Sequence, residues 1–141
     1  MRHRPILRAA VAGLAYFGIV FAIAFGLGIL RISVANPLLG KTLAVIIELA
    51  ILLTLAWKIC RVLVARFQVP TPLNVRLLMG AVAFIVLMLA EISGSTPGFN
   101  RTLAEHFQQY REIAGILGLA GQIAFATFPA IQSIIETRSR A

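Results

Sequence analysis

The chain lacks aspartate altogether and has few charged residues of any kind. Its five acidic residues are all glutamate, charged residues make up 13% of the 141 positions, and apolar residues make up 60%, with a mean hydropathy of +0.92. A water-soluble domain of this length needs far more charge to cover its surface. We therefore expect an all-α membrane protein in which residues 1–141 form a single transmembrane domain and the lipid bilayer is the first partner.

Cysteine and histidine are almost missing as well. Cys60 is the single cysteine, which excludes an intramolecular disulfide, a CxxC redox pair and a multi-cysteine metal site, so we interpret it as a packed or lipid-facing thiol. His3 and His106 fall outside the apolar runs, so no histidine pair lies in the membrane to hold a haem. The chain also lacks a glycine-rich phosphate loop and a GxSxG motif. We predict no metal and no cofactor. An enzyme stays open as an alternative only if Glu48 or Tyr110 is its single catalytic residue.

Positive charge is the one excess. The formal net charge is +8 and the isoelectric point is near 11.4, with 13 basic residues. In a soluble protein this balance would suggest nucleic acid, but no basic surface is interleaved with exposed aromatic residues, so we expect no nucleic-acid partner. Basic residues that flank membrane spans explain the charge better. The arginine- and alanine-rich composition is typical of GC-rich bacterial genomes, which suggests a bacterial inner membrane.

Four long apolar runs predict four transmembrane helices. The spans are expected at about 9–30, 42–64, 72–93 and 113–135. At ~1.5 Å per residue each is long enough to cross a hydrocarbon core of ~30 Å. Asn36-Pro37 and Gly40 are expected to break the chain before the second span, and the segments 67–72 and 93–98 are turn-rich. The first run exceeds the ~7–15 residues of a signal-peptide core, which favours a retained helix.

A short amphipathic helix is expected just before the fourth span. Thr102 and Glu105 have the spacing of a capping box, and Leu103, Phe107 and Tyr110 recur at helical spacing. Such a helix suits the membrane interface. The alternative is an exposed first turn of the fourth helix.

The basic residues predict the orientation of the spans. Nine of them belong to the N-terminus, the middle loop region and the C-terminus: Arg2, Arg4, Arg8, Lys58, Arg61, Arg66, Arg76, Arg138 and Arg140. Four belong to the other side: Arg31, Lys41, Arg101 and Arg111. Because basic residues stay on the cytoplasmic side, we predict that both termini are inside, which is an N-in/C-in topology.

Small residues form stripes on the first and fourth predicted helices. They are Ala15, Gly18, Ala22 and Gly26 on the first, and Gly115, Gly118, Gln122, Ala126, Pro129 and Ser133 on the fourth. Small residues let membrane helices approach closely. The stripes therefore predict either the packing core of the bundle or an interface with another subunit, and Phe17, Phe21 and Phe25 are expected on the opposite, lipid-facing side of the first helix.

Two residues of the fourth predicted helix carry more specific expectations. Pro129 has no N–H, so we predict a kink and a carbonyl left without its helical donor one turn earlier, near Phe125. Gln122 lies on the small face, where its amide is expected to hydrogen-bond across to another helix.

Acidic residues inside spans are the strongest functional candidates. Glu48 lies roughly 9 Å inside the second span, and Glu91 lies near the outer end of the third. A charge at the bilayer centre costs ~2.5–3.5 kcal/mol, so such residues mark function unless they are paired. Taking the second and third spans as antiparallel neighbours places both acids in the outer half of the membrane. The predicted substrate or ion pathway contains Glu48, Glu91, Arg31, Lys41, Arg111 and Gln122.

Each acid also has a structural interpretation. Glu48 is either a proton or cation site, a contact for a cationic group, or half of an ion pair with Lys41, Arg31 or a residue of a neighbouring helix. Glu91 is expected to reach the interface or to pair with Arg111.

On the inner side, Trp57, Lys58 and Arg61 are typical of an aromatic and basic anchor at the lipid headgroups. The alternative is recognition of an anionic lipid or ligand headgroup.

Three functions are compatible with these features. The first is a homo-oligomeric channel or transporter for a small solute or cation, with Glu48 in the pathway. The second is a non-catalytic accessory or assembly subunit of a larger membrane complex, docked through the small-residue faces. A membrane-embedded enzyme is the third and the least supported by the residues present.

Overall fold

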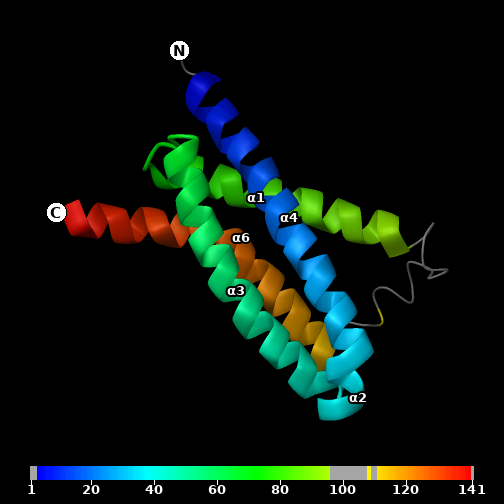
Figure 1. Ribbon diagram of the computed structural model, residues 1–141. Coiled ribbons are helices and arrows are strands. Elements are labelled where there is room, and N and C mark those ends of the chain that lie inside the picture. Colours follow the sequence, from blue (N-terminus) through cyan, green and yellow to red (C-terminus); the bar gives the residue numbers. More distant parts are fainter. Residues whose placement is uncertain (1–2, 96–107, 109–110, 141) are drawn as a thin grey trace.

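The computed structural model describes residues 3–95, 108 and 111–140, and the regular structure in these ranges is helical. Its elements are α1 (His3–Leu30), the π-helix η1 (Arg31–Ala35), α2 (Asn36–Leu39), α3 (Lys41–Arg66), α4 (Leu73–Ser95) and α6 (Ile113–Arg140). Four helices are long and apolar enough to cross a membrane, the first being the continuous run from α1 through η1 and α2 (Figure 1). The all-helical prediction with four apolar helices is confirmed, whereas the amphipathic helix expected around 101–110 lies outside the described residues apart from Gln108.

The chain reverses at Gly40, one of the two breaks expected between the first and second spans, and not at Asn36-Pro37. Pro37 does not break the helix, because it lies in the first turn of α2, where its missing N–H costs no hydrogen bond. Gly40 adopts a φ of 86°, a left-handed conformation that suits glycine, and its N–H donates to Asn36 O at 3.0 Å. The first predicted span is therefore extended by a π-helical turn and a short α-helix before α3 begins.

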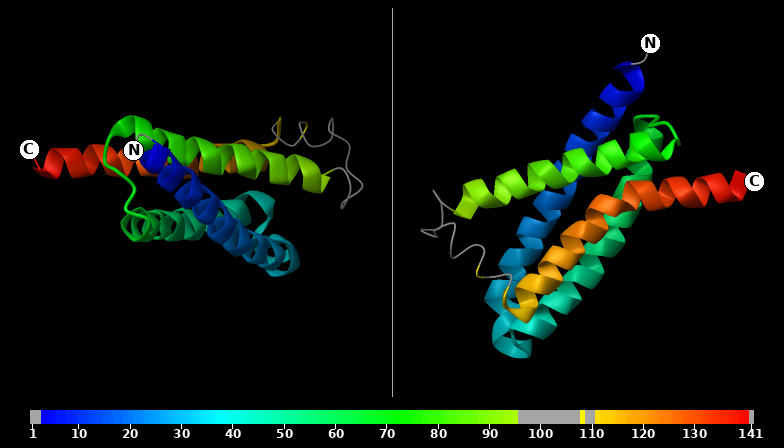
Figure 2. Two further views of the ribbon diagram at one scale, coloured as in Figure 1. Left: turned by 90° about the horizontal axis from the view of Figure 1, so that it is seen from above. Right: turned by 180° about the vertical axis from the view of Figure 1, so that it is seen from behind.

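Each long helix packs closely, backbone to backbone, on two of the other three. α1 packs on α3 and α4, and α6 packs on the same two helices, so that the order around the bundle is α1, α3, α6, α4. Within the described residues α3 and α4 share no packing interface, and they diverge from their connecting turn (Figure 2). The expectation that these consecutive helices are antiparallel neighbours is wrong. The 67–72 connection is long enough to carry the chain to the diagonal position, whereas the tight turn at Gly40 keeps α3 beside α1.

Both termini and the 67–72 turn lie at the same end of the bundle, called here the termini end (Figure 2). The other end, which contains η1, α2 and the start of α6, is called the Gly40 end. This arrangement matters below because charged side chains gather at both ends.

Two glycines place helix backbones in direct contact. A Cβ on Gly13 of α1 would lie 2.6 Å from the backbone O of Met79 in α4, and a Cβ on Gly80 of α4 would overlap the backbone O of Ala126 in α6. Only glycine permits these approaches. Gly13 and Gly80 therefore set the crossing points of α1 on α4 and of α4 on α6.

The predicted small stripe of α1 is not the packing face. A Cβ added to Gly18 or to Gly26 would meet no atom within 4 Å, and both glycines are exposed. The core instead uses residues on a neighbouring face, namely Ala9, Ala12, Tyr16 and Val20. Ala15 packs against the core, so the prediction that the stripe builds the core of the bundle is wrong for Gly18, Ala22 and Gly26.

The fourth-helix face is packed only in its second half. Pro129 and Ser133 are buried, but Gly118 has nothing within 4 Å. Gly121, which the sequence analysis did not single out, is the glycine of this region that contacts a neighbour, since its Cβ would lie 2.6 Å from Leu49 Cδ2 of α3.

The kink and the orphaned carbonyl expected at Pro129 are present. α6 bends near its middle (Figure 1), and Pro129 lies inside it. The carbonyl of Phe125, one turn earlier, accepts a hydrogen bond from the buried Tyr16 hydroxyl of α1 at 2.9 Å. The rings of Tyr16 and Phe125 stack with centroids 4.2 Å apart. α1 therefore supplies the donor that proline removes.

The outer surface of the bundle is largely apolar. Ile85 and Leu89 of α4 are 57% and 59% exposed, and Ile123 and Ile131 of α6 are also exposed. Exposed apolar side chains along every long helix are what a lipid environment favours, so these faces agree with the indication of a membrane protein.

Candidate functional sites at the two ends of the bundle

Arg31 and Glu48 form an ion pair at the Gly40 end. Arg31 begins η1, and its Nε contacts a carboxylate oxygen of Glu48 on α3. The two side chains are 24% and 16% exposed, so that most of each is shielded. A π-helical turn is wider than an α-turn and changes the direction in which the following side chains point. The ion-pair alternative for Glu48 therefore has a partner in the structure, and that partner is Arg31.

Lys41 and Glu112 join the start of α3 to the segment before α6. Lys41 Nζ donates to Glu112 Oε2 at 2.5 Å, and both side chains are exposed. The hydrogen bond and the positive charge of Lys41 lower the pKa of the Glu112 carboxyl below its ordinary value. The pair fastens two segments of the Gly40 end but is open to solvent.

Glu91 and Gln122 connect α4 to α6. Gln122 Nε2 donates to Glu91 Oε1 at 2.5 Å, which confirms the expectation that this amide bonds across helices. An amide donor stabilises the charged carboxylate without neutralising it.

The structure thus brings five of the six predicted pathway residues into three pairs, and each pair links different segments. Arg111, the sixth, is exposed just before α6. Among the described residues no group of three or more His, Cys, Asp or Glu side chains is placed to hold a metal ion. The chemistry available at the Gly40 end is ion pairing and hydrogen bonding between helices.

The predicted headgroup anchor lies toward the other end. The rings of Trp57 and Phe128 form a T-shaped pair with centroids 5.2 Å apart. The backbone O of Trp57 accepts a hydrogen bond from Gln132 Nε2 at 3.1 Å. Lys58 and Arg61 are exposed on the same helix. Trp57 therefore also packs α3 on α6, in addition to any role at the interface.

Arg76 forms four hydrogen bonds, and the sequence analysis did not propose it as a site. It lies in the first turn of α4 and is 1% exposed. Its Nε donates to Pro70 O at 2.9 Å and its Nη2 to Val69 O at 3.3 Å, while Glu136 of α6 accepts from Nη2 at 3.0 Å. Arg76 thereby ties α4, the preceding turn and the end of α6 together.

A signal for this network was available in the sequence. Four of the five glutamates belong to the other side of the predicted topology, so Glu136 is the one acid among the basic residues of the termini end. A lone acid surrounded by cations is expected to pair with one of them. Which arginine is buried could not be read from the pattern, because it depends on the path of the 67–72 turn.

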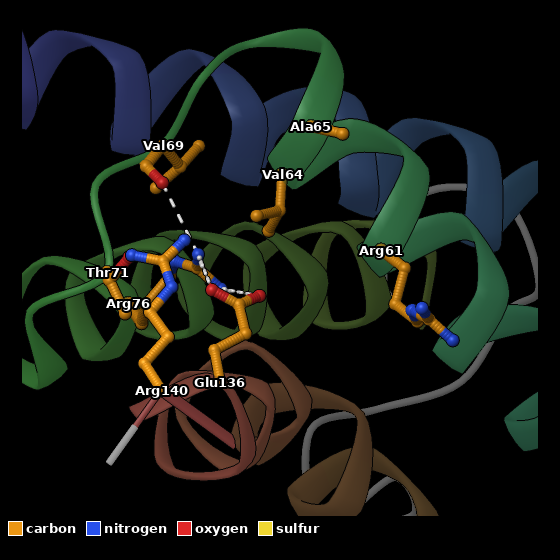
Figure 3. Close-up of a pocket in the computed structure, with 8 residues that line it drawn as sticks. All are labelled: Arg61, Val64, Ala65, Val69, Thr71, Arg76, Glu136 and Arg140. Atoms are coloured by element: carbon orange, nitrogen blue, oxygen red, sulfur yellow. Dashed lines mark hydrogen bonds and ion pairs between the residues drawn. The ribbon is translucent and has the colours of Figure 1, made fainter. Parts of the chain in front are cut away.

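Beside this network lies a pocket of about 350 Å³ (Figure 3). It is lined by Arg61, Val64, Ala65, Val69, Thr71, Arg76, Glu136 and Arg140. Figure 3 shows Glu136 between Arg61 on one side and Arg76 with Arg140 on the other. A neighbouring pocket of about 330 Å³ shares Arg61, Glu136 and Arg140, so the two are parts of one hollow between α3 and α6.

Cys60 is fully buried in the same half of the bundle. The packed alternative of the prediction therefore holds, and a thiol without exposed surface is a poor target for lipid attachment.

No family model matches the chain, and no curated protein or solved structure is significantly similar to it. The functional argument therefore depends on the two charged regions and on the faces that the bundle leaves open.

Proposed function

We propose that the protein crosses the membrane four times, with the termini end in the cytoplasm. The proposal is supported by the four apolar helices and by the nine-to-four excess of basic residues at that end. Reporter fusions after Arg66 and at the C-terminus are then expected to report the cytoplasm. A C-terminal fusion that reports the outside would contradict the topology.

Within the membrane, we infer a non-catalytic partner subunit that associates with other transmembrane helices. One observation carries this inference: the Gly18, Ala22 and Gly26 stripe of α1 is left open by the bundle, while Glu48 is paired within the chain. Close contact between membrane helices needs small residues of this kind. A cation pathway, by contrast, needs an acid that is available to the cation.

The mass of the purified particle in lipid nanodiscs tests the association. We expect a mass above that of one 15.3 kDa chain, from copies of the chain or from other co-purified membrane proteins. The double substitution Gly18→Leu with Gly26→Leu is expected to reduce the particle to one chain, because bulky side chains hold the backbones apart.

Gly28→Leu is the matched control. Gly28 also has nothing within 4 Å but lies on a different side of α1 from Gly26, so the particle is expected to be unchanged. A wild-type particle that contains a single chain would contradict the proposed association.

The second candidate is a channel or transporter with Glu48 in its pathway. It is favoured by the position of the Arg31–Glu48 pair, which is shielded and involves the first residue of a π-helix, an element that often occurs at functional sites. In this mechanism the transported cation would displace Arg31 from the carboxylate.

Glu48→Gln separates the two candidates. If Glu48 is structural, the substitution leaves Arg31 partly buried without its counter-charge and lowers stability by about 1–3 kcal/mol, between the values for exposed and buried pairs. Arg31→Gln in addition is then expected to restore part of the loss. If Glu48 serves transport, the variant keeps its thermal stability and loses cation flux in proteoliposomes.

A further inference from the structure

The hollow at the termini end has the size of a ligand site. Its two pockets have volumes of about 350 and 330 Å³, and sites for small molecules begin at ~300 Å³. It lies between the last turns of α3 and α6 and beside the 67–72 turn (Figure 3). The last turns of α3 and α6 carry four of the 13 basic residues of the chain, namely Arg61, Arg66, Arg138 and Arg140.

The charge of the hollow is only partly balanced. Three arginines and one glutamate line it. The glutamate, Glu136, forms an ion pair with Arg76, in which Nη2 lies 3.0 Å from Oε2. Arg61 and Arg140 have no ion-pair or hydrogen-bond partner among the residues that the structure describes. Arg61 and Arg140 lie on the two sides of Glu136 (Figure 3), so the hollow keeps an excess of positive charge for an anion, and guanidinium is well suited to phosphate.

A buried acceptor adds to the second pocket. Gln132 is 4% exposed, and its Nε2 donates to Trp57 O at 3.1 Å. Its Oε1 is buried and has no donor among the described residues. The region thus combines two cations with an amide oxygen suited to a hydroxyl group.

One border of the hollow is apolar. Trp57 and Ile135 line the second pocket, and Ile135 is 49% exposed. Ile131, one turn earlier on the same face of α6, is 39% exposed. A ligand held at the arginines would therefore have an apolar surface beside it, as the acyl chains of a lipid require.

We propose that this hollow binds the phosphodiester headgroup of an anionic phospholipid. Arg61 and Arg140 hold the phosphate, a headgroup hydroxyl donates to Gln132 Oε1, and the acyl chains lie along Ile131 and Ile135. The phosphate chemistry is shared with soluble phosphate esters, and the apolar border favours the lipid. The inference rests on the proposed membrane topology, which puts the arginines at headgroup level, and not on the proposed association of α1.

Native mass spectrometry of the full chain in a non-ionic detergent tests the site. Phosphatidylglycerol, phosphatidylcholine and glycerol 3-phosphate are added separately at equal concentrations. We expect one phosphatidylglycerol molecule to remain bound at least about tenfold more strongly than phosphatidylcholine, since basic residues attract a lipid with a net negative charge more than one without. Equal retention of both lipids would overturn the proposal, and so would binding of glycerol 3-phosphate as strong as that of phosphatidylglycerol.

Two double variants of equal charge locate the binding. Arg61→Gln with Arg140→Gln is expected to remove the preference for phosphatidylglycerol. Arg66→Gln with Arg138→Gln, which changes two exposed arginines of the same helix ends outside both pockets, is expected to keep it. Equal losses in the two variants would overturn the proposal, because they would show attraction by overall charge.

The lipid comparison on the wild-type chain tests the proposal even if the variants fail to fold. It is also separate from the test of the proposed association, because a single-chain particle can retain the lipid and an associated particle can fail to do so. A C-terminal reporter fusion that reports the outside would, by contrast, contradict the topology that places Arg61 and Arg140 at the level of the lipid headgroups.

Discussion

At the Gly40 end Arg31 and Lys41 each form an ion pair with one glutamate, whereas at the termini end Arg76 meets four acceptor atoms. The Arg31–Glu48 and Lys41–Glu112 pairs join side chain to side chain, and the second of them is exposed. Arg76 is buried and bonds to two backbone carbonyls as well as to both oxygens of Glu136. Backbone acceptors cannot move away without unfolding the turn, so we expect the termini end to be the more rigid of the two.

The largest effect is expected from Arg76→Met. The substitution removes the side chain that bonds the Val69 and Pro70 carbonyls in the described structure, and it removes the ion-pair partner of Glu136. We expect a loss of about 3 kcal/mol in unfolding free energy, measured by thermal or denaturant unfolding in detergent.

Lys58→Met is the control for removing a basic residue, since Lys58 is exposed on α3. We expect little change from it. If the two variants unfold alike, Arg76 does not hold the termini end together.

Close helix packing gives the next largest effect. Gly80→Ala places a Cβ against the backbone of Ala126 and is expected to cost about 2–3 kcal/mol, because α4 and α6 must separate. Gly118→Ala changes a glycine with no neighbour within 4 Å and is expected to be neutral or slightly stabilising in a helix. Equal melting temperatures for the two variants would contradict the crossing of α4 on α6 described above.

The Tyr16 hydroxyl offers a smaller and more specific test. Tyr16→Phe keeps the ring stacked on Phe125 and leaves the Phe125 carbonyl without a donor, which is expected to cost about 1–2 kcal/mol. Pro129→Ala restores a backbone N–H one turn later, so it is expected to be less harmful in the Tyr16→Phe background than in the wild type. A double-mutant cycle measures this coupling, and additive effects would show that the two residues act independently.

The smallest effect is expected at Lys41 and Glu112. The pKa of Glu112 is lower in the folded chain than its ordinary value of 4.5, so the pair stabilises the fold above that pH and loses its contribution as the pH falls through the lowered pKa. Lys41→Gln is expected to change the melting temperature little at pH 7 and to flatten its dependence on pH below about 4.5. A parallel pH dependence in the two proteins would exclude this contribution.

The sequence was informative where one physical effect dominates. Long apolar runs predicted the four helices, and the missing N–H of Pro129 predicted an unsatisfied carbonyl at Phe125. It could not predict that Tyr16 supplies the donor, because that depends on how α1 crosses α6. The face of α1 was misjudged for a related reason: Gly13 and Gly18 are equally small, and only the path of α4 decides which of them is covered.

The candidate sites also include some that the sequence could predict and one that it could not. The residues of the Gly40 end stood out because a glutamate in an apolar run is conspicuous. Arg76 did not, since one arginine among several basic residues looks like part of the cytoplasmic flank. Its burial is produced by the 67–72 turn, whose carbonyls point inward, and that geometry has no simple signature in the residue pattern.

The diagonal placement of α3 and α4 has a consequence for biosynthesis. When α4 has been made, the one helix it can pack on is α1, because its other neighbour, α6, ends about 45 residues later. At ~5–20 residues per second the ribosome needs about 2–9 s to complete that stretch. During this interval Gly80 of α4 is uncovered, and Arg76 lacks its ion-pair partner, Glu136. A nascent chain halted before α6 is therefore expected to be the form that quality-control proteases and chaperones recognise most readily.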